Sequence, residues 1–387
     1  MAGAPLHLAV ALDGAGWHPV AWREPGARPD ALVDPDYWVD LVTEAERGLL
    51  DFVTVEDSMG LQGSMRRGPD PRTDRVQGRL DALMTLARVA PVTSHIGLVP
   101  TATTTFTEPF HVSKAVATLD WVSTGRAGWR AQLSRAWEEP LFGRRPSITE
   151  EDLFAEAADH VEVVRRLWDS WEDDAEVRDV AAGRFVDRDK LHYVDFDGPR
   201  FSVRGPSITP RPPQGQPVVV ALAHITPAFR FGATSADVVL ITPHDSDEAA
   251  SILTEVREHQ AAAGRADQPI HVFADVVVAL DSADGESGAD RLARLDAIAG
   301  KPLRSDALIC AGSASDLADT LEALAAAGLT GFRLRPAVLP DDLTAITRDL
   351  VPELQRRGAF RTEYEASSLR GLLGLPRPAN RYAPDRP

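Results

Sequence analysis

The chain has 387 residues, of which 44% are hydrophobic, and it carries a formal net charge of −17 with a pI of about 5.0. This length suits one large α/β domain or two ordinary ones. The acidic field disfavours nucleic acids and anionic membranes as partners. Residues 1–16 lack the basic segment of a signal peptide, and no apolar run approaches the roughly 20 residues of a membrane helix.

The chain contains a single cysteine, Cys310, in the apolar run ALICAG. One cysteine excludes an internal disulfide framework, and this usage is typical of cytoplasmic proteins. No activating neighbour stands beside Cys310, so we expect a buried and unreactive thiol.

Short apolar runs rich in β-forming residues alternate with amphipathic helical patterns along the chain. The predicted strands cover residues 6–12, 52–55, 96–99, 127–133, 218–222, 236–241, 270–278 and 331–334. Strand–helix units without a polar linker predict an α/β fold, a (β/α)8 TIM-type barrel with insertions, in a single domain over residues 1–387. A doubly wound open sheet is the alternative. We expect an extended excursion at about 183–217, and a tail at 360–387 outside the repeat.

The most informative segment covers residues 95–134, where the predicted strand 96–99 runs into Thr101 and the threonines at 103–105. Ligand-contacting groups gather at the carboxyl ends of parallel strands, so at least one hydroxyl is predicted to contact a ligand. The plainer interpretation is that these threonines are present for their strand propensity or as helix caps. Asp57, which follows the strand 52–55, is either a hydrogen-bond acceptor for a ligand or the cap of a turn or helix.

Other candidates stand near predicted strand ends or helix starts. Thr226 begins a helix after a strand, so its hydroxyl and the free N–H groups form either a phosphate cradle or an ordinary cap. His18 follows the first strand and is a candidate for ligand binding or acid–base catalysis, although lone histidines are more often structural. Glu150 opens a long helix, where carboxylates are favoured, and Phe154 lies on the apolar stripe of that helix.

Sequence signatures of several enzyme classes are absent. The chain has no GxGxxG after a strand, no Walker loop, no GxSxG elbow, no HExxH and no CxxC. A dinucleotide-binding subdomain, a serine hydrolase and a metal site are therefore unsupported.

Long segments of the chain resemble a known group in the same order. These segments are AWREPG, DPDYW, ERGLLDFVTVEDS, HIGLVPTATTTFTEPFHVSKAVATLDWVSTGRAGW, AAGRFVDRDKLHYVDFDGPRFSVRGP and VPELQRRGAFRTEYEASSLRGLLGL. The chain resembles flavin-dependent monooxygenases of the bacterial luciferase-like superfamily, in the nitrilotriacetate and dibenzothiophene-sulfone monooxygenase branch. The resemblance implies a TIM-type barrel that oxygenates a small organic substrate with O2 and FMNH2, through flavin C4a-peroxide chemistry. It also implies a separate flavin reductase as a transient partner and a homo-oligomer.

The resemblance also implies a set of cofactor-binding positions. Asp57, Thr101 and Ser134 match FMN-binding positions, and Thr226 replaces a phosphate-binding serine. Glu150 and Phe154 stand where relatives carry His and Tyr.

Three further departures from the family pattern concern the pocket. Arg130 stands where Asn is usual, and Phe229 stands where Gly is usual and is expected to crowd the phosphate. The insertion that helps cover the substrate is reduced to about residues 280–306. Two alternatives stay open: an F420-dependent oxidoreductase of the same fold, and a barrel that has lost catalysis and serves as a flavin carrier or assembly subunit.

Overall fold

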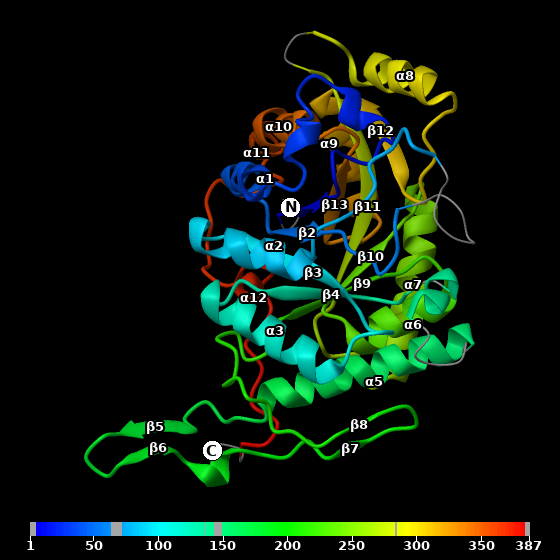
Figure 1. Ribbon diagram of the computed structural model, residues 1–387. Helices are drawn as coiled ribbons and strands as arrows, with labels where there is room; N and C mark the ends of the chain where they lie inside the picture. The colour runs from blue at the N-terminus through cyan, green and yellow to red at the C-terminus, as the bar shows by residue number, and fades with distance from the viewer. Residues whose placement is uncertain (1–4, 63–71, 135, 143–148, 283–284, 384–387) are drawn as a thin grey trace.

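The computed structural model describes residues 5–62, 72–134, 136–142, 149–282 and 285–383. Within these ranges, eight parallel strands close into a barrel, because β10 pairs with both β9 and β11 (Figure 1). The barrel strands are β1 His7–Leu12, β2 Phe52–Val55, β3 Gly97–Thr103, β4 Gly128–Gln132, β9 Val218–Leu222, β10 Val238–Ile241, β11 His271–Leu280 and β13 Gly331–Pro336. The predicted (β/α)8 barrel is confirmed, and the open-sheet alternative is wrong because the sheet closes on itself.

The strands predicted from the sequence are the strands of the barrel. One further strand, β12 Leu308–Gly312, pairs with β11 outside the closed ring and was not predicted. It carries Cys310, which is half-buried, and burial raises the pKa of this thiol to about 11. The thiol is therefore protonated at neutral pH, as expected for an unreactive cysteine.

Helices cover the outside of the barrel (Figure 1). They are α1 Pro35–Arg47, α2 Ala82–Val89, α3 Pro109–Val122, α4 Glu139–Phe142, α5 Glu150–Asp169, α6 Thr226–Ser235, α7 Ser246–Ala262, α8 Gly288–Ala299, α9 Ala314–Ala326, α10 Asp341–Ala345 and α11 Val351–Arg356. The last short helix, α12 Leu369–Leu372, instead packs at the amino end of the barrel interior. A π-helical turn, Ile346–Leu350, joins α10 to α11. At the start of α9, Ser313 and Asp316 form a reciprocal capping box.

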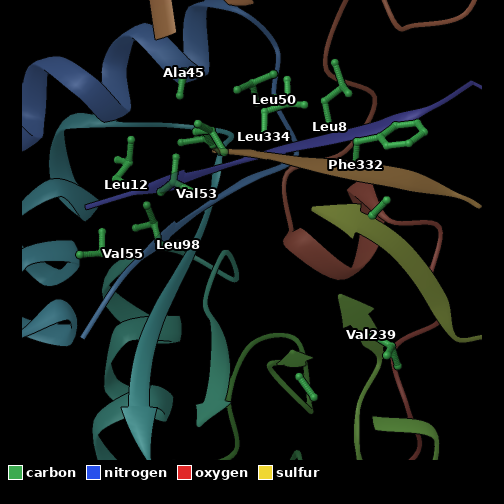
Figure 2. Packing of buried hydrophobic residues seen from close by; sticks show 14 of the residues in the cluster. Leu8, Leu12, Ala45, Leu50, Val53, Val55, Leu98, Val239, Phe332 and Leu334 are labelled. Carbon is green, nitrogen blue, oxygen red and sulfur yellow. The ribbon is translucent and has the colours of Figure 1, made fainter. Parts of the chain in front are cut away.

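The main core lies between the strands and this helical layer. Leu12, Val53 and Leu334 project from β1, β2 and β13 on the side of α1, which carries Ala45 (Figure 2). These side chains are fully buried. Their burial against the helices stabilises the barrel by roughly 1.5–3 kcal/mol for each large side chain.

A second core fills the inside of the barrel at the amino ends of its strands. Its members are Ala9, Phe52, Val99, Val218, Val220, Val238, Leu240 and Phe273, together with Leu369, Leu373 and Leu375 of the C-terminal tail. We call this set the apolar plug. The tail is thus part of the barrel interior: His271 Nε2 lies 2.7 Å from the Leu373 carbonyl oxygen, and a Cβ on Gly97 would lie 2.5 Å from Leu369.

Two short antiparallel hairpins follow α5 and extend away from the barrel (Figure 1). They consist of β5 Glu176–Asp179 with β6 Arg184–Val186, and β7 Phe196–Asp197 with β8 Ser202–Val203. Their base is fixed by Arg211, whose Nε donates to Asp169 at 3.0 Å. Among the helices of the described residues, none has the length and apolar character needed to span a bilayer.

Candidate active site

A cavity of about 820 Å³ opens at the carboxyl ends of the barrel strands. Its wall comes from the loop after β1 (residues 14–19), the end of β2 (56–58), the end of β4 (130–134), the start of α5 (Glu150, Leu153 and Phe154) and the start of α6 (His224, Ile225 and Ala228). This size is within the range of about 300–1,000 Å³ that is usual for cofactor and ligand pockets.

Arg130 of β4 lies at the base of this cavity and is held by three neighbours. Its Nε donates to Thr101 Oγ1 at 2.9 Å, and its Nη2 donates to Gln132 Oε1 at 2.8 Å and to the Glu56 carboxylate. Burial favours the neutral form of Glu56, but the charges of Arg130 and Arg333 outweigh it, so the pKa of Glu56 lies below its usual value.

The ion pairs continue across the barrel interior. Asp275 of β11 is completely buried and accepts from Arg333 Nε at 2.8 Å and from Arg335 Nε at 2.9 Å. Arg333 Nη1 donates to Thr54 Oγ1 at 3.0 Å and to Glu56 at 3.2 Å. Arg333 therefore links the Arg130–Glu56 pair to the ion pairs of Asp275. We call Glu56, Arg130, Asp275, Arg333 and Arg335 the charged layer; it lies beneath the cavity and above the apolar plug.

Asp57 lines the cavity, and backbone groups hold its carboxylate. One oxygen accepts from Ser58 N at 2.7 Å and the other from Ala82 N at 3.0 Å, at the start of α2. Burial raises the pKa of Asp57 despite these bonds. The geometry thus supports a capping role for Asp57, and its position also leaves it in the cavity wall.

Thr101 lies beneath the cavity rather than in its wall. It is buried, its hydroxyl accepts from Arg130, and it is not among the lining residues. Contact between Thr101 and a flavin stays a prediction.

Ser134 lines the cavity and carries a buried polar atom without a partner. Its backbone N–H donates to Thr105 Oγ1 at 3.0 Å, but its own Oγ has no hydrogen-bond partner among the described residues. Trp137 Nε1, which also belongs to a lining residue, is in the same state. Buried polar atoms without partners are costly, and both atoms are sealed, so a ligand in the cavity would satisfy them only after the side chains turn towards it.

His18 lines the cavity, yet both of its ring nitrogens are occupied. Nδ1 accepts from Val20 N at 3.3 Å, which makes Nε2 the protonated nitrogen, and Nε2 lies 3.1 Å from Asp296 of α8. Burial lowers the pKa of His18 although Asp296 opposes that shift, so the ring is mainly neutral at pH 7. His18 therefore links the loop after β1 to α8, and its catalytic role stays a prediction.

The start of α5 forms part of the cavity rim. Glu150 is exposed to solvent as the first residue of this helix and also lines the cavity. Phe154 is half-buried, and its ring centroid lies 6.2 Å from that of Phe231, another lining residue. The rim thus combines a carboxylate with an aromatic wall.

The start of α6 faces the same cavity without a side-chain cap. Ile225 is the N-cap residue and makes no side-chain hydrogen bond to the helix, while Thr226 is the exposed first helical residue. The interpretation of Thr226 as an ordinary cap is therefore wrong. Phe229 packs in the main core and is not a lining residue, so its ring points away from the cavity.

The sequence does not single out two residues of the wall. Trp17 lies beside Arg335, with the guanidinium carbon 5.9 Å from the ring centroid, and Arg79 Nε donates to Asp13 at 2.9 Å. The signal for Trp17 is the preceding GAG segment: Gly16 has φ of 121°, and a Cβ there would lie 2.4 Å from the Ala337 carbonyl oxygen. Arg79 carries no comparable signal, because its partner is 66 residues away.

Comparison with known proteins agrees with this geometry. Residues 18–327 match the family model described as luciferase-like monooxygenase. The chain belongs to this family. It is 33% identical to nitrilotriacetate monooxygenase component A of Aminobacter aminovorans and 31% identical to N-acetyl-S-(2-succino)cysteine monooxygenase of Bacillus subtilis, each over 98% of both chains. The crystal structure of the long-chain alkane monooxygenase LadA superposes with a TM-score of 0.85 at 24% identity, covering 96% of both chains.

Membership of this family confirms the predicted enzyme class, a flavin-dependent monooxygenase. Among the described residues, no group of three or more His, Cys, Asp or Glu side chains is placed to hold a metal ion.

Proposed function

We propose that the chain is the oxygenase component of a two-component system, which uses O2 and FMNH2 from a separate flavin reductase to oxygenate a small organic molecule. The name "component A" of the 33% identical relative supports a separate supply of reduced flavin. The absence of GxGxxG agrees with a chain that does not bind NADH itself. A cytoplasmic location, a transient contact with the reductase and a homo-oligomer complete the proposal.

The unsatisfied polar atoms of the wall carry this proposal. Ser134 and Trp137 line a cavity of about 820 Å³, a size that suits a large ligand, and each carries a buried polar atom without a partner. Asp57, Ser134 and Trp137 would hold the flavin ring, and Thr226 with the uncapped start of α6 would hold the phosphate. When bound and reduced, FMN supplies the activation of oxygen.

The chain's own residues then orient the flavin and shield it from water. Trp17 and Trp137 contribute aromatic surface to the cavity wall, and His18 links the loop after β1 to α8. Glu150 opposes a phosphate at the rim, but it is exposed, so water screens its charge.

An anaerobic titration tests the proposal. Reduced FMN, oxidised FMN and F420 are each added to the purified protein while tryptophan fluorescence is followed, since Trp17 and Trp137 line the cavity. We expect reduced FMN to bind and quench, and F420 not to bind. The Ser134→Ala variant should bind FMN about 2- to 10-fold more weakly, through loss of one hydrogen bond.

The Ser246→Ala variant is the matched control, since Ser246 is the half-buried first residue of α7 and does not line the cavity. It should bind FMN as the unchanged protein does. Failure of reduced FMN to bind would overturn the proposal, and tight binding of F420 alone would favour the hydride-transferring alternative. Flavin binding without oxygenation of any substrate tried, in the presence of a reductase, NADH and O2, would favour the flavin-carrier alternative.

A further inference from the structure

Arg130 differs from the other arginines of the charged layer in one respect. Its Nε and Nη2 are engaged, but Nη1 makes no hydrogen bond to any described residue. Nη1 keeps some solvent-accessible surface, and Arg130 lines the cavity. Nη1 is therefore open to the cavity. The side chain is only 2% exposed, so the cavity is where this nitrogen can find a partner.

Arg333 and Arg335 have no such free donor. All three guanidinium nitrogens of Arg333 donate hydrogen bonds, to Asp275, Thr54 and Glu56. Arg335 is bound by Asp275 through Nε and Nη2 and by Asp306 through Nη1 at 2.8 Å. A guanidinium fixed on two sides and open on the third has its position determined before any ligand arrives, which lowers the entropic cost of binding.

The charges of the ion pairs balance once Asp306 is counted. Three arginines face Glu56 and Asp275 within the buried layer, and Asp306 pairs with Arg335 from its far side at 2.8 Å. Arg130 is therefore distinguished by its open Nη1 and not by an excess of positive charge.

We propose that Arg130 is an anion-binding residue at the base of the cavity, where Nη1 takes a delocalised monoanion. Two sources have this chemistry: a carboxylate of the substrate, and the deprotonated ring of reduced flavin. The second source rests on the function proposed above, whereas the first does not. Either ligand would complete the hydrogen bonding of a guanidinium that the protein leaves incomplete.

The experiment has two arms with separate probes. In the first, the flavin-free protein is titrated with benzoate and with its neutral analogue benzamide by calorimetry. In the second, the dissociation constants of reduced and oxidised FMN are compared anaerobically, which cancels the shared phosphate. If Arg130 binds an anion, the Arg130→Gln variant should lose the preference for the anionic probe in at least one arm, by about 10-fold or more.

Two variants keep the result interpretable. Arg79→Gln removes a positive charge from the same wall, but Arg79 is already paired with Asp13 and with Ser58 Oγ at 3.2 Å, so the anion preference should change far less. If Arg130→Gln does not fold because Glu56 loses its partner, the double variant Glu56→Gln with Arg130→Gln removes both charges together. The double variant should also lose the preference.

An unchanged anion preference in both arms, in a folded variant without the Arg130 guanidinium, would overturn the proposal. An equal loss in Arg79→Gln would also overturn it, because the general field of the wall would then be responsible. If the unchanged protein binds no FMN, the proposed function fails, but the benzoate arm still tests Arg130.

Discussion

The two halves of the barrel interior are built from opposite chemistry. At the amino ends of the strands, the apolar plug buries Phe52, Phe273 and Leu369 with no charged side chain among its members. At the carboxyl ends, the same strands carry the charged layer, in which Asp275 lies only two residues beyond Phe273 on β11. Burial of the apolar plug stabilises the fold. Burial of the charged layer contributes less to the free energy of unfolding, because removing charges from water is costly.

The contrast separates the part of the barrel that stabilises the fold from the part that is proposed to bind a ligand. A buried ion pair is weak support for stability, and replacing it with apolar residues is often neutral or favourable. Five charged residues inside the barrel therefore indicate a role beyond folding. Their position under the cavity wall agrees with the ligand-binding role proposed for Arg130.

The largest effect is expected from breaking the charged layer at its centre. Asp275→Ala leaves Arg333 and Arg335 without their shared carboxylate, so the free energy of unfolding should fall by about 3–5 kcal/mol. Binding of reduced FMN should weaken too, because Arg333 would no longer support Glu56. Guanidinium unfolding and anaerobic titration measure the two effects, and a loss below 1 kcal/mol would contradict the account.

A comparable loss of stability is expected from the plug, but without an effect on the ligand. Leu369→Ala removes a fully buried side chain from the tail and should cost about 2–5 kcal/mol. The affinity for reduced FMN should stay the same, since the plug lies at the other end of the barrel. Val180→Ala, at a position 94% exposed on the hairpins, is the control and should change stability by less than about 0.5 kcal/mol. Weaker flavin binding in Leu369→Ala would show that the two halves are coupled.

A smaller effect is expected at the cavity rim. Glu150→His replaces the exposed carboxylate that opposes a phosphate, and a change in an exposed charge is worth up to about 1 kcal/mol. FMN should therefore bind up to about 5-fold more tightly, and riboflavin, which lacks the phosphate, should bind as before. An equal gain for riboflavin would mean that Glu150 acts on the ring instead.

The smallest effect concerns acid stability. Burial would raise the pKa of Asp306, but the charge and hydrogen bonds of Arg335 outweigh it and hold the pKa at about 2. A carboxyl whose pKa falls on folding contributes stability above its unfolded pKa of 3.8, and that contribution is lost as the pH falls towards 2. Asp306→Asn should therefore flatten the decline of the unfolding free energy over this range. If Asp306→Asn leaves the pH dependence of the unfolding free energy unchanged, the Arg335–Asp306 ion pair does not contribute as described.

The barrel was predictable from the sequence because each strand is a local apolar run that pairs with its neighbours in a regular order. Asp57 could be placed at the cavity because it follows a strand, whereas Ser134 and Glu150 were predicted as cofactor-binding positions by the family resemblance. The charged layer could not be predicted as a unit. Its ion pairs join residues 58 to 277 positions apart, and no local pattern records such a contact.

The C-terminal tail shows the same limit. The segment expected to lie outside the repeat packs into the inside of the barrel through Leu369, Leu373 and Leu375, and this packing was not predicted. A short apolar run such as LLGL predicts burial but not the surface it packs on, because that surface is assembled from distant strands.

A crystal structure with FMN bound tests the central claim most directly. The account predicts the flavin ring in the cavity between Asp57, Ser134 and Trp137, with Ser134 Oγ hydrogen-bonded to it and Arg130 Nη1 facing the ring or a neighbouring substrate site. FMN bound elsewhere on the molecule, or an occupied cavity in which Ser134 Oγ and Arg130 Nη1 both stay unpartnered, would contradict the account.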